Sequence, residues 1–303
     1  MRISIDVKLR KKISSTLRMK NDMKAMKLGI LYLVPTPIGN MGDMTYRAVE
    51  VLSGVSLIAA EDTRTSQKLL NHYGIKTRLI SYHKFNESQR TAILLAELAQ
   101  GKDIALISEA GTPGISDPAS IVVNQAIQKG FQVVCLPGAT ACITALAASG
   151  LPTGSFIFYG FLPGRQRDRA GILDKLKQQP ETIILYEAAH RIVNTLKELA
   201  ANFGARPAVV AREISKLHET YLRGNLTDLA QLKDMETRGE FVILIQGRPP
   251  EPISDEQLII RIRNMLKRNI RLKDISATLA TETGATPNRI YQLALHLKKD
   301  KAS

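Results

Sequence analysis

The chain contains short apolar runs, each followed by a stretch in which apolar residues recur every three or four positions. Short apolar runs are typical of buried strands, and the wider spacing is typical of amphipathic helices. In the first half this pattern predicts strands at Leu31–Pro35, Val55–Ala60, Arg78–Tyr82, Asp103–Ile107 and Phe131–Leu136. Because strands and helices alternate, we expect parallel βαβ units and an α/β domain.

The helices of this half are bounded by residues that start or stop helices. Asp43 and the pair Ser116-Asp117 are candidate N-caps, since a side-chain oxygen there can accept a free backbone N–H. Glycines follow several predicted last turns, where they suit a left-handed C-cap. The expected helices run from Asp43 to Leu52, Thr65 to Tyr73, Glu87 to Gln100, Asp117 to Lys129, and from Thr140 to Ser149.

In the second half the predicted strands lie closer together, with a hairpin near Ser215–His218. A mixed sheet is therefore more consistent with the spacing than a purely parallel one. The expected strands are Phe156–Gly160, Thr182–Tyr186, Ala208–Arg212, Thr220–Arg223 and Glu240–Gln246, and the expected helices are Arg167–Gln178, Ala189–Asn202 and Leu226–Glu236.

The turn-rich segment at residues 150–154 divides the two halves, which gives α/β domains over residues 28–150 and 151–248. A proline-rich linker then leads into a helical tail over residues 253–303, with helices expected at Asp255–Lys267, Leu272–Thr281 and Thr286–Leu297. The last two are joined by a glycine-containing turn, the spacing of a helix-turn-helix in which Asn288, Arg289 and Gln292 would enter a nucleic-acid groove. A three-helix bundle for packing or dimer contacts explains the pattern equally well.

Charge shifts the choice of partner toward nucleic acid. The net charge is +14, and a balance this basic favours polyanions. Part of the excess lies in residues 1–27, which lack the apolar core of a secretory signal and which we expect to form a poorly ordered extension. No apolar stretch is long enough to span a bilayer, so no membrane anchor is expected. The two cysteines lack a CxxC spacing, which favours free, buried thiols and a cytoplasmic location.

Two glycine-containing turns follow successive strands of the first half. Gly111-Thr112-Pro113-Gly114 follows one strand, and Pro137-Gly138-Ala139-Thr140 follows the next. Such turns let backbone approach a ligand closely, although each alone also suits an ordinary tight turn. Neither turn matches a P-loop or a G-x-G-x-x-G fingerprint, so a ligand held by backbone amides, such as an adenosine, fits better.

Polar clusters also follow strands. Glu61-Asp62-Thr63-Arg64 suits acid–base work, but an N-cap at Asp62 or Thr63 with a surface ion pair explains it equally well. Glu187, His190 and Arg191 form a second cluster, and Lys216 belongs to a third. Lys84 and the arginines at 165, 167 and 169 could line a phosphate-backbone track or a solvated face. No metal-ligand spacing occurs, so no metal is expected.

Seven segments in order carry a resemblance to a known family. They are LYLVPTPIGN (Leu31–Asn40), AAEDTR (Ala59–Arg64), SEAGTPGISDP (Ser108–Pro118), LPGAT (Leu136–Thr140), FYGFLP (Phe158–Pro163), YEAAHR (Tyr186–Arg191) and ARE-SK-HE (Ala211–Glu219). The set resembles the tetrapyrrole-methylase-like class of S-adenosylmethionine methyltransferases, and within it the branch that methylates a ribose 2′-oxygen of a cytidine in the decoding region of 16S rRNA.

The resemblance implies two α/β domains of the tetrapyrrole methylase type with S-adenosyl-L-methionine in the cleft between them. It further implies a cytoplasmic homodimer that acts on 16S rRNA or the 30S subunit. The cofactor-binding residues carried over are Pro35, Gly111, Thr112, Pro113, Gly114, Ser116, Asp117, Ala139, Thr140, Ala141, Tyr159, Gly160, Phe161, Leu162, Ala188 and Ala189.

Methylation of a neutral hydroxyl needs in-line positioning and help in removing the proton. The candidate bases are Glu61, Asp62, Glu109, Glu187 and His190. Arg64, Arg191 and Lys216 are candidates for orienting a phosphate or the 2′-oxygen. Two other functions stay open here: methylation of a small tetrapyrrole such as uroporphyrinogen or precorrin, and a ligand-sensing DNA-binding regulator.

Overall fold

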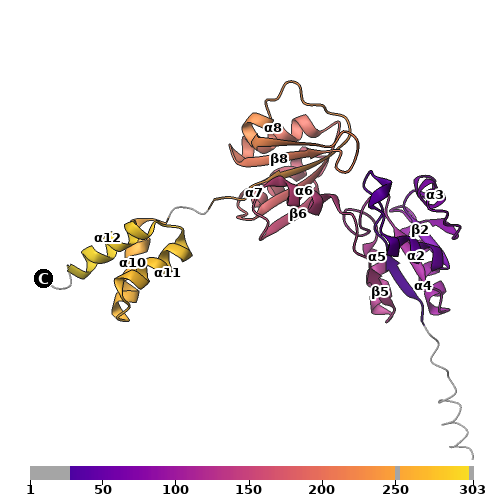
Figure 1. Ribbon diagram of the computed structural model, residues 1–303, viewed down its shortest axis with the longest axis horizontal. Coiled ribbons are helices and arrows are strands. Elements are labelled where there is room, and N and C mark those ends of the chain that lie inside the picture. Colours follow the sequence, from indigo (N-terminus) through magenta and orange to yellow (C-terminus); the bar gives the residue numbers. More distant parts are fainter. Residues whose placement is uncertain (1–27, 250–252, 300–303) are drawn as a thin grey trace, which may run out of the picture. The chain divides into compact units, whose positions relative to one another are not determined.

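The computed structural model describes residues 28–249 and 253–299. The basic segment 1–27, expected to be a poorly ordered extension, lies outside them. The chain divides into two compact units. The larger unit contains both predicted α/β halves, and the smaller contains the short segment Lys177–Glu181 and the helical tail (Figure 1).

The first half forms a five-stranded sheet in which every pairing is parallel, as predicted. Its strands are β1 (Ile30–Leu33), β2 (Leu57–Ala60), β3 (Leu79–Ser81), β4 (Ile104–Ile107) and β5 (Gln132–Cys135), in the order β3-β2-β4-β1-β5. All residues of β2 and β4 are buried, because helices cover both faces of the sheet. The carboxyl ends of the strands therefore share one edge, where the connecting loops gather.

Alternate side chains of each strand point to opposite faces of this sheet. Leu31 and Leu33 pack with α4 (Glu87–Ala99) and α5 (Ser120–Gln128), whereas Val34 packs on the other side with α2 (Tyr46–Gly54). The helix α3 (Thr63–His72) covers that second face through Leu70. The two apolar faces explain why the strands are nearly continuous hydrophobic runs in the sequence.

The second half forms the mixed sheet that the sequence predicts. Its order is β6-β7-β10-β8-β9, and only β6 and β7 pair in parallel. The hairpin predicted at Ser215–His218 joins β8 to β9. The strands are β6 (Phe156–Phe161), β7 (Thr182–Ala188), β8 (Pro207–Arg212), β9 (Thr220–Asn225) and β10 (Glu240–Ile245).

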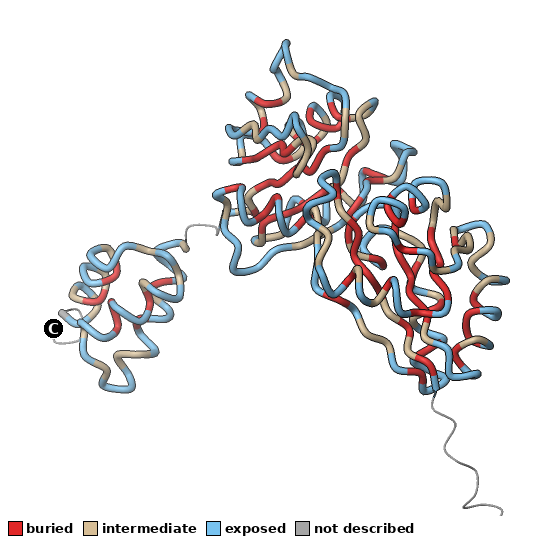
Figure 2. The backbone as a smooth tube through the Cα atoms, turned by 45° about the vertical axis from the view of Figure 1, so that its right-hand side comes forward, coloured by how far each residue is buried: buried red, intermediate tan, exposed pale blue. Residues whose placement is uncertain are grey.

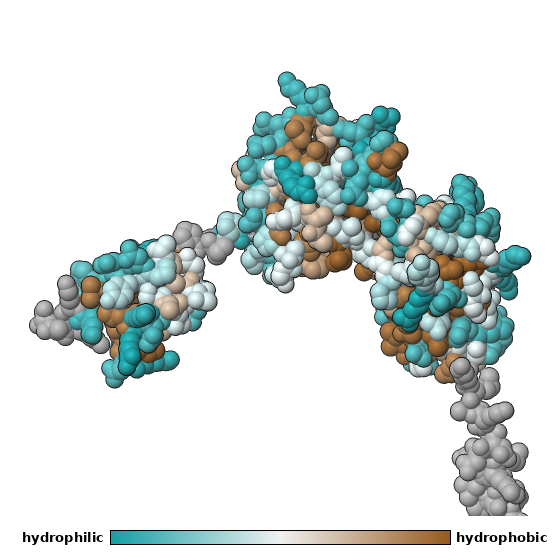
Figure 3. All heavy atoms as spheres, viewed as in Figure 1, coloured by the Kyte–Doolittle hydropathy of each residue, from teal (hydrophilic) through white to brown (hydrophobic). Residues whose placement is uncertain are grey.

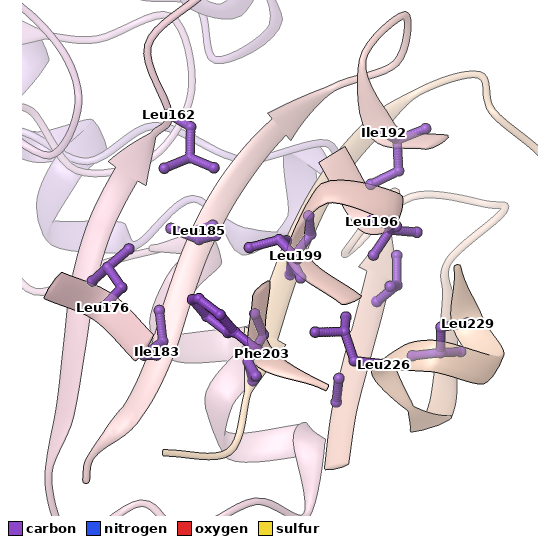
Figure 4. Close-up of a cluster of buried hydrophobic side chains, with 14 of the residues drawn as sticks. Leu162, Leu176, Ile183, Leu185, Ile192, Leu196, Leu199, Phe203, Leu226 and Leu229 are labelled. Atoms are coloured by element: carbon purple, nitrogen blue, oxygen red, sulfur yellow. The ribbon is translucent and has the colours of Figure 1, made fainter. Parts of the chain in front are cut away.

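One face of the mixed sheet is covered by α7 (Gln166–Lys177), α8 (Ile192–Phe203) and the short α9 (Leu226–Leu229) around the core drawn in Figure 4. The opposite face is covered by α6 (Ala141–Ser149), which follows β5 of the first sheet. Cys142 and Leu146 of α6 pack against Ile184 and Leu244 of the second sheet. This helix therefore connects the two halves of the larger unit, since it follows a strand of the first sheet and packs on the second.

Several predicted helix starts are wrong. Asp43 does not cap α2; it lies in a 3-10 turn, η1 (Met41–Asp43), and Thr45 caps α2 by accepting the N–H of Ala48. Asp117 does not cap α5, which begins at Ser120 without a side-chain cap, because the Asp117 carboxylate is turned back to the N–H of Gly114. Local sequence favours both aspartates as caps, but loop contacts take their oxygens.

Two helices of the second half also differ from their predicted bounds. The helix expected at residues 226–236 is only the short α9 (Leu226–Leu229), and Leu232, next in the apolar spacing, is exposed rather than part of the core. The helix α8 begins at Ile192 rather than Ala189, since β7 continues to Ala188. In both cases tertiary packing sets the boundary.

The tail contains α10 (Asp255–Lys267), α11 (Leu272–Thr283) and α12 (Pro287–Lys299), close to the predicted bounds. A capping box between Ser254 and Gln257 starts α10. The three helices share one apolar core, visible as buried segments on their facing sides in Figure 2. Arg289, a candidate for groove contacts, is instead paired with Asp255 at 2.6 Å. This supports the bundle interpretation of the tail.

The described helices include none that is long and apolar enough to cross a membrane. In the view of Figure 3, hydrophobic residues are interspersed with hydrophilic ones over the surface of both units. Both cysteines are free, but only Cys142 is buried; Cys135 lies exposed at the end of the edge strand β5, contrary to the expectation.

Candidate cofactor and active site

Three loops at the carboxyl edge of the first sheet are joined into one structure. Thr36, after β1, and Gly111, after β4, exchange backbone hydrogen bonds of 2.9 and 3.0 Å. The Thr112 hydroxyl contacts the Ala139 carbonyl at 3.0 Å and the Thr140 hydroxyl at 2.6 Å, which ties in the loop after β5. The sequence predicts two glycine-containing turns here, and the structure brings them into direct contact.

Glycines are required at two points of this assembly. A Cβ at Gly138 would lie 2.5 Å from the Cβ of Pro35, so only glycine allows the loops after β1 and β5 to meet. Gly114 has a φ of +90°, a conformation that side chains with a Cβ rarely adopt. The result is a surface of backbone and small side chains, as a ligand held by backbone groups requires.

The far end of the glycine loop reaches the second sheet. Ser116 has a φ of +70°, and a Cβ placed on Gly160 of β6 would lie 2.8 Å from its hydroxyl. The turn before it is closed by Asp117, whose carboxylate accepts the Gly114 N–H at 2.5 Å. Predicted cofactor residues from both halves are thus neighbours at Ser116 and Gly160.

An aromatic group borders this junction on the second half. The Tyr186 ring lies 4.9 Å from that of Phe158 and 5.6 Å from that of Phe161, and its hydroxyl accepts the Cys142 N–H at 3.1 Å. Burial raises the pKa of Tyr186. Of the predicted residues on β6, Tyr159 and Phe161 are exposed and available for contact with a ligand.

The remaining predicted cofactor residues differ from one another in position and in burial. Ala141 starts α6, beside the loop after β5, and Ala188 ends β7. The side chains of Leu162 and Ala189 face the hydrophobic core of the second half, as Figure 4 shows for Leu162. Pro113 is buried within its loop. Any contact of Leu162 or Ala189 with a ligand is left to their backbone.

A group of carboxylates lies at the same edge as the loops. Glu61 follows β2, Glu109 follows β4, and Asp117 belongs to the glycine loop. Burial raises the pKa of Glu61, and the charges of Asp117 and Glu109 raise it further, against an opposing effect of His83. Burial also raises the pKa of Asp117, although the Gly114 N–H stabilises its charged form. A carboxyl group with a raised pKa beside a ligand loop is suited to accept a proton.

Two members of this cluster are missing from the candidate bases that the sequence suggests. In the sequence His83 is only a neighbour of Lys84, and Asp117 only a part of the cofactor loop. Both lie in loops that follow the carboxyl end of a parallel strand, β3 for His83 and β4 for Asp117. Loops at these ends converge in α/β sheets, and that is the signal from which the cluster can be anticipated.

The neighbours of Glu61 in its motif have a simpler role. Asp62 is the N-cap of α3 and accepts the Arg64 N–H at 2.8 Å, a bond that lowers its pKa. The Arg64 side chain is 91% exposed and lies 3.5 Å from Asp62. The cap and surface ion pair that the sequence allows for this motif therefore describe Asp62 and Arg64, and leave Glu61 as the residue with an unusual environment.

The candidates on β7 and α8 form a buried network. Glu187 is 2% exposed and contacts Arg191 at 2.9 Å and the Thr195 hydroxyl at 2.6 Å. Arg169 is also buried; it donates to Thr195 at 3.0 Å and pairs with Glu198 at 2.5 Å. Arg169 therefore cannot line a phosphate track, contrary to expectation. With its acceptor oxygens engaged, Glu187 is held as a packing element.

His190 and Lys216 lie in different surroundings. His190 is exposed in the turn before α8. Lys216, in the β8–β9 hairpin, pairs with Glu213 at 2.9 Å and Glu240 at 3.0 Å. Burial alone would lower the pKa of Lys216, but its hydrogen bonds to these carboxylates raise it, so the group stays cationic.

The hairpin reaches the loop after β1. The Lys216 side chain fills the space where a Cβ of Gly39 would lie, and Ser215 hydrogen-bonds Asp43. Gly39 and Glu109 both line a cavity of about 120 Å³ that also contains Ser108. The structure thus places Lys216 at the border of the cavity that Glu109 faces. Among the described residues, no group of three or more His, Cys, Asp or Glu is placed to hold a metal ion.

The sequence matches a known protein family. The family model of the tetrapyrrole (corrin/porphyrin) methylases matches residues 30–230. A relative from Synechocystis sp., named ribosomal RNA small subunit methyltransferase I, is 48% identical over 90% of this chain and 100% of its own length. Relatives with the same name from Escherichia coli O157:H7 and Bacillus subtilis are 42% and 44% identical, and they cover 88% and 76% of this chain and 95% and 79% of their own lengths.

Solved structures share the fold at lower identity. A diphthine synthase aligns with a TM-score of 0.58 and 14% identity, over 72% of this chain and 90% of that one. A cobalt precorrin-4 methyltransferase aligns with a TM-score of 0.53 and 18% identity, over 72% of this chain and 94% of that one. At these identities the likeness is one of fold alone, and it agrees with the predicted pair of α/β domains.

Proposed function

Because this chain belongs to the tetrapyrrole methylase family and, within it, to the ribosomal RNA small subunit methyltransferase I family, we propose that it methylates 16S rRNA, at a ribose 2′-oxygen of a cytidine in the decoding region. S-adenosyl-L-methionine is the proposed methyl donor. We further propose that the enzyme acts in the cytoplasm as a homodimer on the 30S subunit.

The joined loops fit the cofactor. Gly111 and Gly114 expose backbone rather than side chains, Ala139 and Thr140 are small, and Gly160 closes the space from the second half. A nucleoside with a short cationic chain can lie against such a surface without displacing side chains. S-adenosylmethionine, when bound there, supplies an electrophilic methyl group on a sulfonium. The protein must then position the ribose oxygen in line and take its proton.

Glu61 is the proposed proton acceptor. Its raised pKa makes its carboxylate a stronger base than an ordinary surface glutamate. Asp117 links the base to the cofactor loop, because it closes the turn at Gly114 and its charge acts on Glu61. This link between the glycine loop and the Glu61 carboxylate is the observation that carries the proposal of Glu61 as the proton acceptor. Lys216 holds the hairpin against the loop after β1, at the border of the Glu109 cavity.

The test is transfer of labelled methyl from S-adenosylmethionine to 30S subunits that lack the modification. The site is mapped by resistance of the methylated ribose to alkaline hydrolysis. One protected ribose in 16S rRNA is the expected result, and Glu61→Gln should abolish most of the transfer. Glu50→Gln, an exposed carboxylate on α2, is the matched control and should leave transfer unchanged.

The same assay can overturn the proposal. Transfer to uroporphyrinogen in the absence of RNA would make the enzyme a tetrapyrrole methylase. Bound S-adenosylmethionine with no transfer to 30S subunits or to free 16S rRNA would exclude rRNA as the substrate. Transfer that places the label on a base rather than on a ribose would contradict the 2′-oxygen as the acceptor.

A further inference from the structure

A second depression lies beside the proposed site. It is an open groove of about 680 Å³ bounded by α3, by the edge strand β3 and by the first turns of α4. Its polar lining consists of Thr63, Arg64, Gln67, Lys68, Asn71, Ser81 and Arg90. None of the described residues that line it carries a negative charge. Three cations with amide and hydroxyl groups between them are suited to contact a polyanion.

The cations of this groove are not committed to other partners. Within the described part of the chain, neither Lys68 nor Arg90 has a side-chain ion pair or hydrogen bond, and Arg64 makes only the exposed contact with Asp62. This differs from Arg169, Arg191 and Lys216, each of which is tied to a carboxylate within 3.0 Å. Cations free of internal partners are available to phosphates.

One end of the groove lies near the proposed base, through neighbours of Glu61 that line it. Ala60, the last residue of β2, is the register partner of Ser81, the last residue of β3. Ser81 lines the groove, and Glu61 directly follows Ala60. Thr63, at the start of α3, also lines it. A polyanionic chain bound along the groove would therefore reach the carboxyl edge of the sheet next to Glu61.

An exposed aromatic ring lies near this end of the groove. Phe85 is 95% exposed, in the turn between β3 and α4. Asn86 fixes the turn: its side chain accepts the His83 N–H at 2.8 Å and donates to the Ser81 hydroxyl at 3.2 Å. The Arg90 N–H donates to the Asn86 carbonyl at 2.9 Å, which joins the turn to the groove wall. Phe85 is thus presented to solvent by a well-bonded turn, and its neighbour His83 acts electrostatically on Glu61.

We propose that this groove binds the sugar–phosphate backbone of a single-stranded segment of rRNA, and that Phe85 stacks on a base beside the nucleotide to be methylated. The proposal rests on rRNA being the substrate. Phosphate contacts fix the register of a strand, and an aromatic side chain holds an unpaired base whatever its identity. Lys68 and Arg90 are assigned to phosphates, and Phe85 is a positioning residue for the target ribose.

The experiment measures binding apart from catalysis. Equilibrium binding of unmodified 30S subunits, without a methyl donor, is followed by filter retention over a range of salt concentrations. For Lys68→Ala with Arg90→Ala, affinity should fall, and the slope of log K against log salt should decrease by about 0.7 for each phosphate that the variant no longer neutralises. Lys129→Ala, an exposed cation beyond α5, is the matched control and should change neither quantity.

The stacking role gives a different signature. Phe85→Ala should weaken binding by about 5- to 150-fold with the salt slope unchanged, and Phe85→Tyr should restore most of the affinity. In turnover, KM for 30S subunits should rise while the affinity for S-adenosylmethionine stays as in the wild type. Ile127→Ala, another exposed apolar side chain on the first half, is the control.

Failure of this proposal is distinct from failure of the proposed function. Unchanged affinity and salt slope in the groove variants would overturn the groove even if the wild type methylates 30S subunits. Groove-dependent binding without methyl transfer by the wild type would support the groove and overturn the function. Loss of self-association in the variants, with RNA affinity intact, would assign the groove to a second copy of this chain and overturn the proposal.

Discussion

β2 is followed by Glu61 and, three residues later, by Arg64, while Glu187 lies at the end of β7 and Arg191 follows four residues later. In the sequence these pairs are near equivalents. In the structure Arg64 points into solvent, and Glu61 is left among other carboxylates with a raised pKa. Arg191 instead folds back onto Glu187, which is buried in its ion pair.

The contrast between the two glutamates shows what makes a carboxylate available for chemistry. A buried glutamate whose oxygens already accept bonds from an arginine and a hydroxyl is held in place by those contacts and has no free oxygen to offer a substrate. A partly buried glutamate that faces other acids is destabilised as an anion and takes a proton readily. The first arrangement supports the fold, and the second is suited to the reaction.

The largest effect is expected from removing the basicity of Glu61. Glu61→Gln should lower the rate of methyl transfer by about 10²- to 10⁴-fold, because an amide of the same shape cannot accept the proton. Single-turnover transfer to 30S subunits measures this, with S-adenosylmethionine affinity as a check on the site. A rate within twofold of the wild type would remove Glu61 from the mechanism and erase the contrast with Glu187.

The complementary test removes Glu187, the buried glutamate of the comparison. Glu187→Ala should lower the free energy of unfolding by about 3–5 kcal/mol, because Arg191 would be left without its buried partner. Urea denaturation measures the change, and the exposed Glu50→Ala serves as the control. A decrease below about 1 kcal/mol would place the Glu187 pair with ordinary surface ion pairs.

The pH dependence sharpens the contrast further. The transfer rate should rise by roughly tenfold per pH unit up to the pKa of Glu61, which burial and the neighbouring carboxylates raise from its ordinary value, and then level off. The base must be unprotonated, so activity is lost as pH falls. The Glu61→Gln variant should lack this acid limb in its residual rate. An identical limb in that variant would assign the titration to another group.

The stability of the protein should change with pH in the opposite direction. Because the folded state raises the pKa of Glu61, this carboxyl contributes stability below its unfolded pKa, and that contribution is lost as pH rises through its folded pKa. The stability of the Glu61→Gln variant should therefore match that of the wild type in acid and equal or exceed it near neutral pH. Urea midpoints at several pH values measure the difference.

The smallest effect is expected at Asp62. Asp62→Ala removes the N-cap of α3 and should lower the urea midpoint slightly, whereas Asp62→Asn, which can also cap, should lower it less. Methyl transfer should be nearly unchanged in both variants under conditions in which they are folded. If Asp62→Asn instead reduced transfer as strongly as Glu61→Gln, the assignment of the two neighbours would have to be reversed.

Much of this architecture follows from the amino-acid sequence. The strands of both sheets, the parallel and mixed pairings, the β8–β9 hairpin and the three helices of the tail appear as predicted, because each depends on periodicity and turn residues that act locally. The two glycine-containing turns of the candidate cofactor site are also evident in the sequence, although only folding brings them into contact. Helix starts are less predictable, as Asp43 and Asp117 show.

The amino-acid pattern therefore identifies which residues could carry the chemistry and near which strand ends they lie. It left Glu61, Asp62, Glu109, Glu187 and His190 as equals, because a one-dimensional pattern contains no information on burial or on neighbours distant in the chain. Only the tertiary structure distinguishes their surroundings, since burial and the charges near a carboxyl group depend on contacts between distant parts of the chain. The same holds for the groove, whose cations come from separate helices and meet only across the sheet edge.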